Sequence, residues 1–158
     1  MEKDIFQEWL NNNKDCEALT DKSYKKSYQK QNKTNYEGNV NTELVTYGDA
    51  VLKFVLCEIL WEKGICNKLT EKKKEYESDK VLVSVIARHY DILKYLRYDK
   101  NDDNKPKDYN YPEKGNNPYK YIATAIEACL GEIFIQEKDF KKIEKIIKYW
   151  IKLIDNKG

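Results

Sequence analysis

The amino-acid sequence predicts an all-α fold, because its apolar residues recur with the spacing of helices. This spacing is clearest over residues 42–64, 121–134 and 139–154. The alternation of apolar and polar residues that marks a half-buried strand persists nowhere in the 158 residues. Given usual helix lengths, we expect about six or seven helices.

Length and composition predict a single globular domain spanning residues 1–158. Charged residues make up 35% of the chain and hydrophobic residues 41%, and no run approaches the roughly 18 apolar residues that a membrane span needs. The opening residues, MEKDIFQEWL, contain acids and lack the apolar core of a signal peptide, so we expect a cytoplasmic protein that does not bind membranes. The four cysteines show no CxxC spacing and indicate neither a zinc site nor disulfides.

The N-terminal part of the chain combines a short helix with a polar connection. An amphipathic helix is predicted from Ile5 to Leu10, and the run Asn11 to Asn13 ends it. Residues 25–41 are rich in Lys, Gln and Asn and are poorly able to form a core. We expect loop with some irregular helix there.

The segment from Thr42 to Gly64 is predicted to be the central, buried helix. Its apolar side chains cover more than one face, as expected of a helix with neighbours on several sides. Thr42 suits the N-cap, and Gly64 suits the C-terminal end. Near the start of this helix, Asp49 directly follows Gly48.

The second half of the chain is predicted to hold further helices around a long loop. Residues 69–77 form a short charged helix, and Asp79 is expected to cap the next one, whose apolar residues run from Val81 to Leu96. The segment from Arg97 to Pro118 contains all three prolines and is predicted to be a long exposed loop. The last helix, 139–154, carries an apolar stripe with which it can dock.

Two carboxylates stand beside small and apolar residues in two segments that are predicted to be buried helices. They are Asp49 in the central helix and Glu127, which stands between Ile126 and Ala128. Burial of a lone carboxylate costs several kcal/mol unless something offsets its charge. Two such acids on two buried helices predict a shared cation. The alternatives are a helix-capping role for Asp49 and a buried ion pair for Glu127.

Three stretches resemble the catalytic domain of ribonuclease III. ALTDKSY, Ala18 to Tyr24, is similar to the family's A-L-T-H-[KR]-S-[YF], with Asp21 where His is usual. LVTYGDAVL, Leu44 to Leu52, resembles L-E-F-L-G-D-[AS]-V-L, and YIATAIEACLGEIF, Tyr121 to Phe134, resembles L-A-D-x-x-E-A-L-I-G-A-[IV]-[YF]. The stretches stand in order, and the similarity runs from about Phe6 to Leu153.

The resemblance implies a metal site with a reduced set of acids. The family usually holds its metal with four carboxylates, and by position only Asp49 and Glu127 remain, because Val45 and Thr124 replace the other two. Spacings of four and three residues place Val45 and Thr124 on the same helical faces as the acids, so both are expected to line the site without a charge. The Mini-III branch is similar in lacking an acid before its GD aspartate and in carrying A-T-x-x-E-A, as Ala123 to Ala128 do.

The function that the resemblance implies is a Mg²⁺-dependent endoribonuclease, with Mn²⁺ as a substitute metal, that cleaves double-stranded RNA during RNA processing, for instance of a ribosomal RNA precursor. It also implies a homodimer that pairs through the GDAVL helices and a chain without a double-stranded-RNA-binding domain. Asp49 and Glu127 are the predicted catalytic and metal-binding residues, since Mg²⁺ needs only one or two protein carboxylates beside substrate phosphates. The alternative is an inactive ribonuclease III-like module that binds RNA or assists assembly.

Basic segments are the predicted contacts for RNA phosphates. The candidates are Lys22 to Lys33, Lys72 to Lys74 and the loop 97–118. A stripe of lysines on the last helix is predicted to be a solvated face instead: Lys141, Lys145, Lys148 and Lys152. His89 is expected to be a packed histidine and not a general base, because the metal can activate the water.

Overall fold

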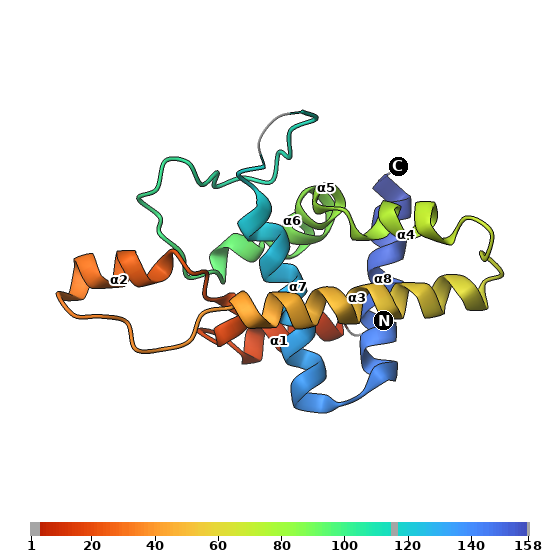
Figure 1. Ribbon diagram of the computed structural model, residues 1–158, viewed down its shortest axis with the longest axis horizontal. Coiled ribbons are helices and arrows are strands. Elements are labelled where there is room, and N and C mark those ends of the chain that lie inside the picture. The colour runs from red at the N-terminus through yellow and green to blue at the C-terminus, as the bar shows by residue number, and fades with distance from the viewer. Residues whose placement is uncertain (1–3, 115–116, 158) are drawn as a thin grey trace.

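The computed structural model describes residues 4–114 and 117–157, and this part of the chain is helical (Figure 1). The longer helices are α1 Ile5–Asn12, α2 Tyr24–Asn32, α3 Thr42–Glu62, α4 Leu69–Glu77, α7 Lys120–Glu137 and α8 Phe140–Lys157. Shorter helical pieces are η1 Glu17–Leu19, α5 Asp79–Val81, the π-helix η2 Leu82–Ala87, α6 Arg88–Tyr90 and η3 Ile92–Lys94. Within the described ranges the only β-type pairing is an isolated bridge between Thr20 and Arg97. The all-α prediction is confirmed.

Helix α3 is the central element, as its apolar pattern predicts. It crosses the middle of the molecule in Figure 1, and its inward side chains are buried. Lys63 ends the helix, and Gly64 follows with φ of 81°, a left-handed conformation that favours glycine. Thr42 is the first helical residue and not the N-cap. Asn41 precedes it, with its side chain donating to the Ala18 carbonyl oxygen at 3.2 Å.

Helix α7 crosses α3 closely enough for the two backbones to touch (Figure 1). A Cβ added to Gly131 would lie 2.8 Å from the Leu44 carbonyl oxygen and 2.9 Å from the Gly48 nitrogen. A Cβ added to Gly48 would overlap the carbonyl oxygen of Glu127. The crossing therefore requires glycine at both positions, and it fixes which residues of the two helices face each other.

The remaining helices cover this pair. The predicted stripe of α8 is buried, including Ile143, Ile147 and Trp150, so its docking role is confirmed. Helix α1 buries Phe6, with its ring 5.1 Å from that of Trp150. None of the helices in the described part of the chain is long and apolar enough to cross a lipid bilayer.

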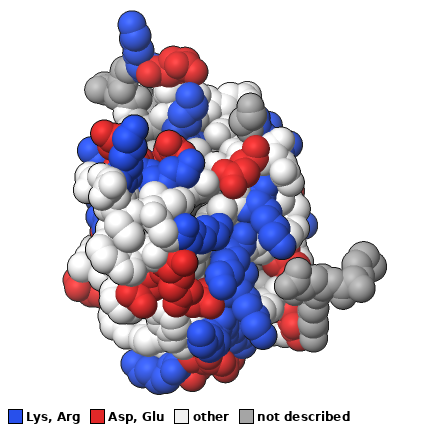
Figure 2. All heavy atoms as spheres, turned by 90° about the vertical axis from the view of Figure 1, so that its right-hand side faces the viewer, with Lys and Arg blue, Asp and Glu red and all other residues white. Residues whose placement is uncertain are grey.

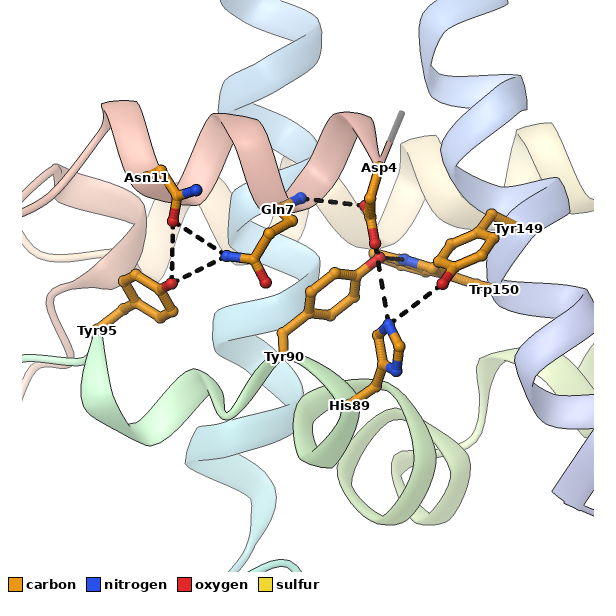
Figure 3. A network of polar contacts seen from close by, with 8 residues as sticks. All are labelled: Asp4, Gln7, Asn11, His89, Tyr90, Tyr95, Tyr149 and Trp150. Atoms are coloured by element: carbon orange, nitrogen blue, oxygen red, sulfur yellow. Dashed lines mark hydrogen bonds and ion pairs between the residues drawn. The ribbon is translucent and has the colours of Figure 1, made fainter. Parts of the chain in front are cut away.

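A polar network ties α1 to α6 and α8 (Figure 3). Asp4 caps α1 by accepting from the Gln7 backbone N–H at 3.1 Å, and it also accepts from the Tyr90 hydroxyl at 3.1 Å. The Trp150 indole donates to the same hydroxyl at 3.1 Å. His89 lies 3.8 Å from Asp4 and 3.3 Å from the Tyr149 hydroxyl. His89 is thus held in a structural network, although its side chain is partly exposed.

Two further local features differ from the sequence-based expectations, and a third agrees with them. Residues 24–32 form a regular helix, because Tyr24 and Tyr28 pack against Tyr36 in the loop that follows. The cap of α5 is Ser78, with its hydroxyl oxygen accepting from the Val81 N–H at 3.4 Å, and Asp79 is the first residue of that helix. No described residue between 95 and 119 is helical, so the long loop is confirmed.

Candidate metal and phosphate site

An open pocket of about 530 Å³ lies where α3 meets α7 and the corner between α4 and α5. It collects four carboxylates and three lysines: Asp49, Glu77, Asp79, Glu127, Lys53, Lys74 and Lys120. Val45 and Thr124 also line it. Both predicted carboxylates and both predicted neighbours therefore meet at one pocket, although they come from helices far apart in the sequence.

The carboxyl groups of Asp49 and Glu127 are near enough to share a hydrogen bond. Glu127 is buried, with 8% of its surface exposed, and burial, followed by its hydrogen bond with Asp49, raises its pKa to about 9. Burial pushes the pKa of Asp49 upward, but hydrogen bonds with Glu127 and Lys53 outweigh it and leave the pKa below its ordinary value. Without a metal, the pair therefore holds one proton, on Glu127, and Asp49 carries the negative charge.

Lys53 is the nearest cation to this pair. Its Nζ lies 2.8 Å from Oδ2 of Asp49, one helical turn away on α3, and 47% of its side chain is exposed. The hydrogen bond with Asp49 raises the pKa of Lys53, so the ammonium stays charged. Sequence reasoning missed this residue, although the i, i+4 spacing from Asp49 was a signal that could have found it.

Glu77 and Asp79 line the pocket with their charges already matched. Both carboxylate oxygens of Glu77 accept from Lys73 Nζ at 3.0 Å. Asp79 accepts from the Asn117 amide at 2.7 Å and lies 3.8 Å from Lys120 Nζ. No local sequence signal marks these acids, because the corner between α4 and α5 brings them to the pocket.

Val45 and Thr124 lie at the pocket as predicted and add no charge. Thr124 donates its hydroxyl to the Tyr121 carbonyl oxygen at 3.1 Å, one turn back along α7. The hydroxyl oxygen keeps acceptor capacity, but its proton is engaged with the backbone. The pocket therefore carries less negative charge than it would with acids at the positions of Val45 and Thr124.

The donor set is small for a resident metal. Within residues 4–114 and 117–157, no group of three or more His, Cys, Asp or Glu side chains is arranged to hold an ion. Asp49 and Glu127 still suit a hard divalent cation that keeps most of its waters. Among the described residues the buried Glu127 forms no ion pair within 4 Å, although Lys53 and Lys120 line the same pocket, and a bound metal would offset the charge of its carboxylate.

The first of the three resembling stretches does not line the carboxylate pocket. Asp21 is buried, accepts from the Ser23 N–H at 3.0 Å and lies 3.6 Å from Lys105 Nζ. Thr20 pairs with Arg97 in the isolated bridge. This stretch anchors the long loop to the helices.

The family comparison covers the pocket. A model of the family described as "Ribonuclease III domain" matches residues 42–138, which is more than half of the chain and spans α3 to the end of α7. That range includes Asp49, Glu127 and the glycine crossing, whereas residues 18–24 lie outside it. The acids that meet in this pocket thus belong to the matched region, and the chain belongs to the ribonuclease III domain family, a family of double-stranded-RNA endoribonucleases.

Proposed function

We propose that this protein is a Mg²⁺-dependent endoribonuclease that hydrolyses phosphodiester bonds of double-stranded RNA. The observation that carries the proposal is the meeting of Asp49 and Glu127 in an open pocket within the region matched by the family. A buried carboxyl with a strongly raised pKa beside a charge partner is characteristic of functional sites. Membership of the family supports the reaction class.

Asp49 and Glu127 would hold the metal, which is Mg²⁺ or Mn²⁺. When bound, such an ion polarises a phosphoryl oxygen and makes its water a better nucleophile. Metal binding would first require deprotonation of Glu127, because its carboxyl group has to release its proton before both oxygens can serve as ligands. Lys53 at the same time loses its pairing with Asp49 Oδ2 and becomes available to a phosphate.

The lysines of the pocket favour a polyanionic substrate. Lys53, Lys74 and Lys120 are exposed side chains at the same opening as the two carboxylates. Their ammonium groups would attract and orient the phosphates that flank the cleaved bond. Double-stranded RNA presents mainly phosphates and 2′-hydroxyls to a protein surface, so shape and charge would select it more than sequence.

A homodimer paired through α3 is part of the proposal. Tyr47, Phe54 and Trp61 recur every seven residues on α3 and form an exposed apolar stripe. Phe54 and Trp61 are each 59% exposed, and Ile135 of α7 is 41% exposed. Large apolar side chains exposed in a row mark interaction surfaces, and the period of seven fits the seam between two packed helices.

An inactive RNA-binding or assembly module is the second candidate. It is favoured by the same pocket, because Val45 and Thr124 stand where acids would strengthen a metal site and Lys53 already neutralises Asp49. On this reading, the pocket binds phosphates without cleaving them.

Cleavage of labelled duplex RNA in Mg²⁺ tests the proposal. We expect the parent protein to produce shorter fragments, and Asp49→Asn and Glu127→Gln to lose cleavage by at least about 100-fold while retaining duplex binding. Glu71→Gln is a matched control, because Glu71 is exposed on α4 and does not line the pocket. Unchanged cleavage by the two pocket variants would refute the site. Binding without cleavage by the parent would favour the inactive module.

A further inference from the structure

Helix α2 is a basic arm without acidic residues. Residues 22–36 contain no Asp or Glu, and five exposed lysines lie on or beside the helix: Lys22, Lys25, Lys26, Lys30 and Lys33. Within the described ranges, none of these five side chains forms an ion pair or a side-chain hydrogen bond. By contrast, several lysines of α3, α4 and α8 are paired with acids in their own helix.

The arm projects from one end of the molecule but is held in place (Figure 1). A polar helix of nine residues is marginal by itself, so its position depends on tertiary contacts. Arg97 supplies them, with its guanidinium 5.0 Å from the ring centre of Tyr24 and 5.7 Å from that of Tyr36. It also donates to the Thr20 hydroxyl at 2.7 Å and to the Tyr36 hydroxyl at 3.1 Å.

The contacts of Arg97 and Tyr36 with α2 determine which side of the helix faces solvent. The Tyr36 ring lies 5.2 Å from the ring of Tyr24 and 5.3 Å from that of Tyr28, so the tyrosine side of α2 faces the loop and Arg97. Ser27 on the same helix is buried, whereas Lys25, Lys26 and Lys30 are exposed. The chain therefore orders a polar helix and leaves its positive charges in solvent.

A second hollow, of about 350 Å³, connects the carboxylate pocket with the start of α2. It shares Lys120 and Thr124 with that pocket and is also lined by Lys22 and Lys105, with Asp21 and Asp102 beside them. Lys105 Nζ lies 4.6 Å from the ring centre of Tyr121 and 3.6 Å from Oδ2 of Asp21, so its charge is partly offset. Lys120, Lys105 and Lys22 thus lie along the hollow between the carboxylate pocket and α2. The nine residues of α2 extend this basic surface by about 13 Å.

We propose that α2 is an accessory surface that binds the phosphate backbone of duplex RNA beyond the carboxylate pocket. The inference rests on the proposed function, because it takes duplex RNA as the ligand of the pocket. Unpaired lysines are the groups that release counterions from a nucleic-acid backbone, and a row of them gives affinity without reading sequence. A braced helix presents these charges with less loss of conformational entropy than a flexible tail would.

The lysine stripe of α8 is the competing surface. Figure 2 shows a band of basic side chains, with acidic side chains beside it, on the face that lies to the right in Figure 1. On α8, Lys148 and Lys141 lie 3.1 Å and 3.9 Å from Glu144, so part of the charge of the α8 stripe is matched within its own helix. Helix α2 carries no such acid, and we assign the accessory surface to it.

Duplex binding without divalent metal tests the proposal. The α2 variant combines Lys25→Gln, Lys26→Gln, Lys30→Gln and Lys33→Gln, and the control makes the same change at Lys141, Lys145, Lys148 and Lys152. Affinity is measured in EDTA over a range of salt concentrations, with a duplex of about 30 base pairs. We expect the α2 variant to weaken binding by about 10- to 100-fold and to reduce the slope of log K against log salt by about 3, while the control changes neither.

A second variant separates charge from folding. Replacing the same four α2 lysines by Arg keeps the charge, so binding should stay within about threefold of the parent. Full affinity in the Gln variant, an equal loss in the α8 control, or a lack of duplex binding by the parent would overturn the proposal. Because no metal is present, a parent that binds RNA but never cleaves it would refute the nuclease activity and leave the role of α2 standing.

Discussion

Gly48 on α3 lies against the backbone carbonyl group of Glu127 on α7, with no space for a side chain between them. Gly131, one turn further along α7, approaches the backbone of α3 in the same way. This contact brings Asp49, the residue after Gly48, beside the carboxyl group of Glu127. The geometry of the candidate metal site is thus a consequence of how closely two helices cross.

Gly48→Ala should damage both stability and metal binding. The added methyl group would meet backbone and not a flexible side chain, so the helices must separate. We expect a loss of about 3 kcal/mol in the free energy of unfolding, measured in urea, and a loss of Mg²⁺ binding measured by calorimetry.

Gly64→Ala is the matched control for this substitution. Gly64 has φ of 81° and no atom near the position of an added Cβ, so only backbone strain is introduced. We expect a cost of about 1 kcal/mol and unchanged Mg²⁺ binding. If Gly48→Ala bound Mg²⁺ as the parent does, the close crossing would not be what sets the site.

Glu127→Gln should stabilise the metal-free protein at neutral and alkaline pH. The pKa of Glu127 rises from 4.5 to about 9 on folding, so the folded protein keeps a proton that the unfolded chain has lost. Stability therefore falls as pH rises from about 4.5 towards 9, and a neutral Gln avoids that loss. We expect a gain of about 1 to 3 kcal/mol at pH 8 that vanishes near pH 4.

Thermal unfolding across this pH range measures the effect, and Glu71→Gln provides the comparison. Glu71 is exposed, so its substitution should leave the pH dependence of the parent intact. Adding Mg²⁺ should raise the melting temperature of the parent and leave that of Glu127→Gln unchanged. A pH-independent difference between parent and Glu127→Gln would mean that Glu127 is not the group that holds the proton.

The long helices could be predicted from the sequence because each buries one side, and this burial produces a periodic pattern of apolar residues. The apolar pattern of α3 and α8 reaches the core in the structure at the expected positions, including Leu52 and Trp150. The convergence of Asp49 and Glu127 was expected from the family resemblance, because both positions belong to the family's metal site. The apolar pattern repeats along a single helix, so it can be recognised in the local sequence.

Features that depend on tertiary contacts were harder to predict. The regular helix α2 has only two tyrosines on its inner side, and it is stabilised by Tyr36 and Arg97, which lie outside it. The approach of Asp79 to the pocket depends on the corner after α4, and Ser78 takes the capping role expected of Asp79. Neither contact has a signature in the local sequence.

Lys53→Met should strengthen Mg²⁺ binding and weaken RNA cleavage. Lys53 would compete with a metal for Asp49, because its Nζ lies 2.8 Å from Oδ2, and its removal would free the carboxylate. We expect Mg²⁺ affinity to rise by about threefold to tenfold, because an exposed ion pair of this kind contributes about 1 kcal/mol. Cleavage should fall, since a cation that would face the phosphate is lost.

Lys72→Met is the control for the loss of a lysine from an intrahelical pair. Lys72 pairs with Glu75 on α4 at 2.9 Å and does not line the pocket. Its substitution should leave Mg²⁺ affinity and cleavage at the values of the parent. Weaker Mg²⁺ binding by Lys53→Met would contradict the competition that the ion pair implies.

Charge placed on the exposed stripe of α3 should separate the proposed homodimer. Phe54→Glu with Trp61→Glu puts two carboxylates where apolar side chains would meet a second copy, and burial of unpaired charge is costly. We expect a dimer for the parent and a monomer for the variant in analytical ultracentrifugation, with unchanged helical content. Thr70→Glu, which adds charge at an exposed position of α4, should remain dimeric. A parent that sediments as a monomer at all concentrations would show that this stripe does not pair α3 with its own copy.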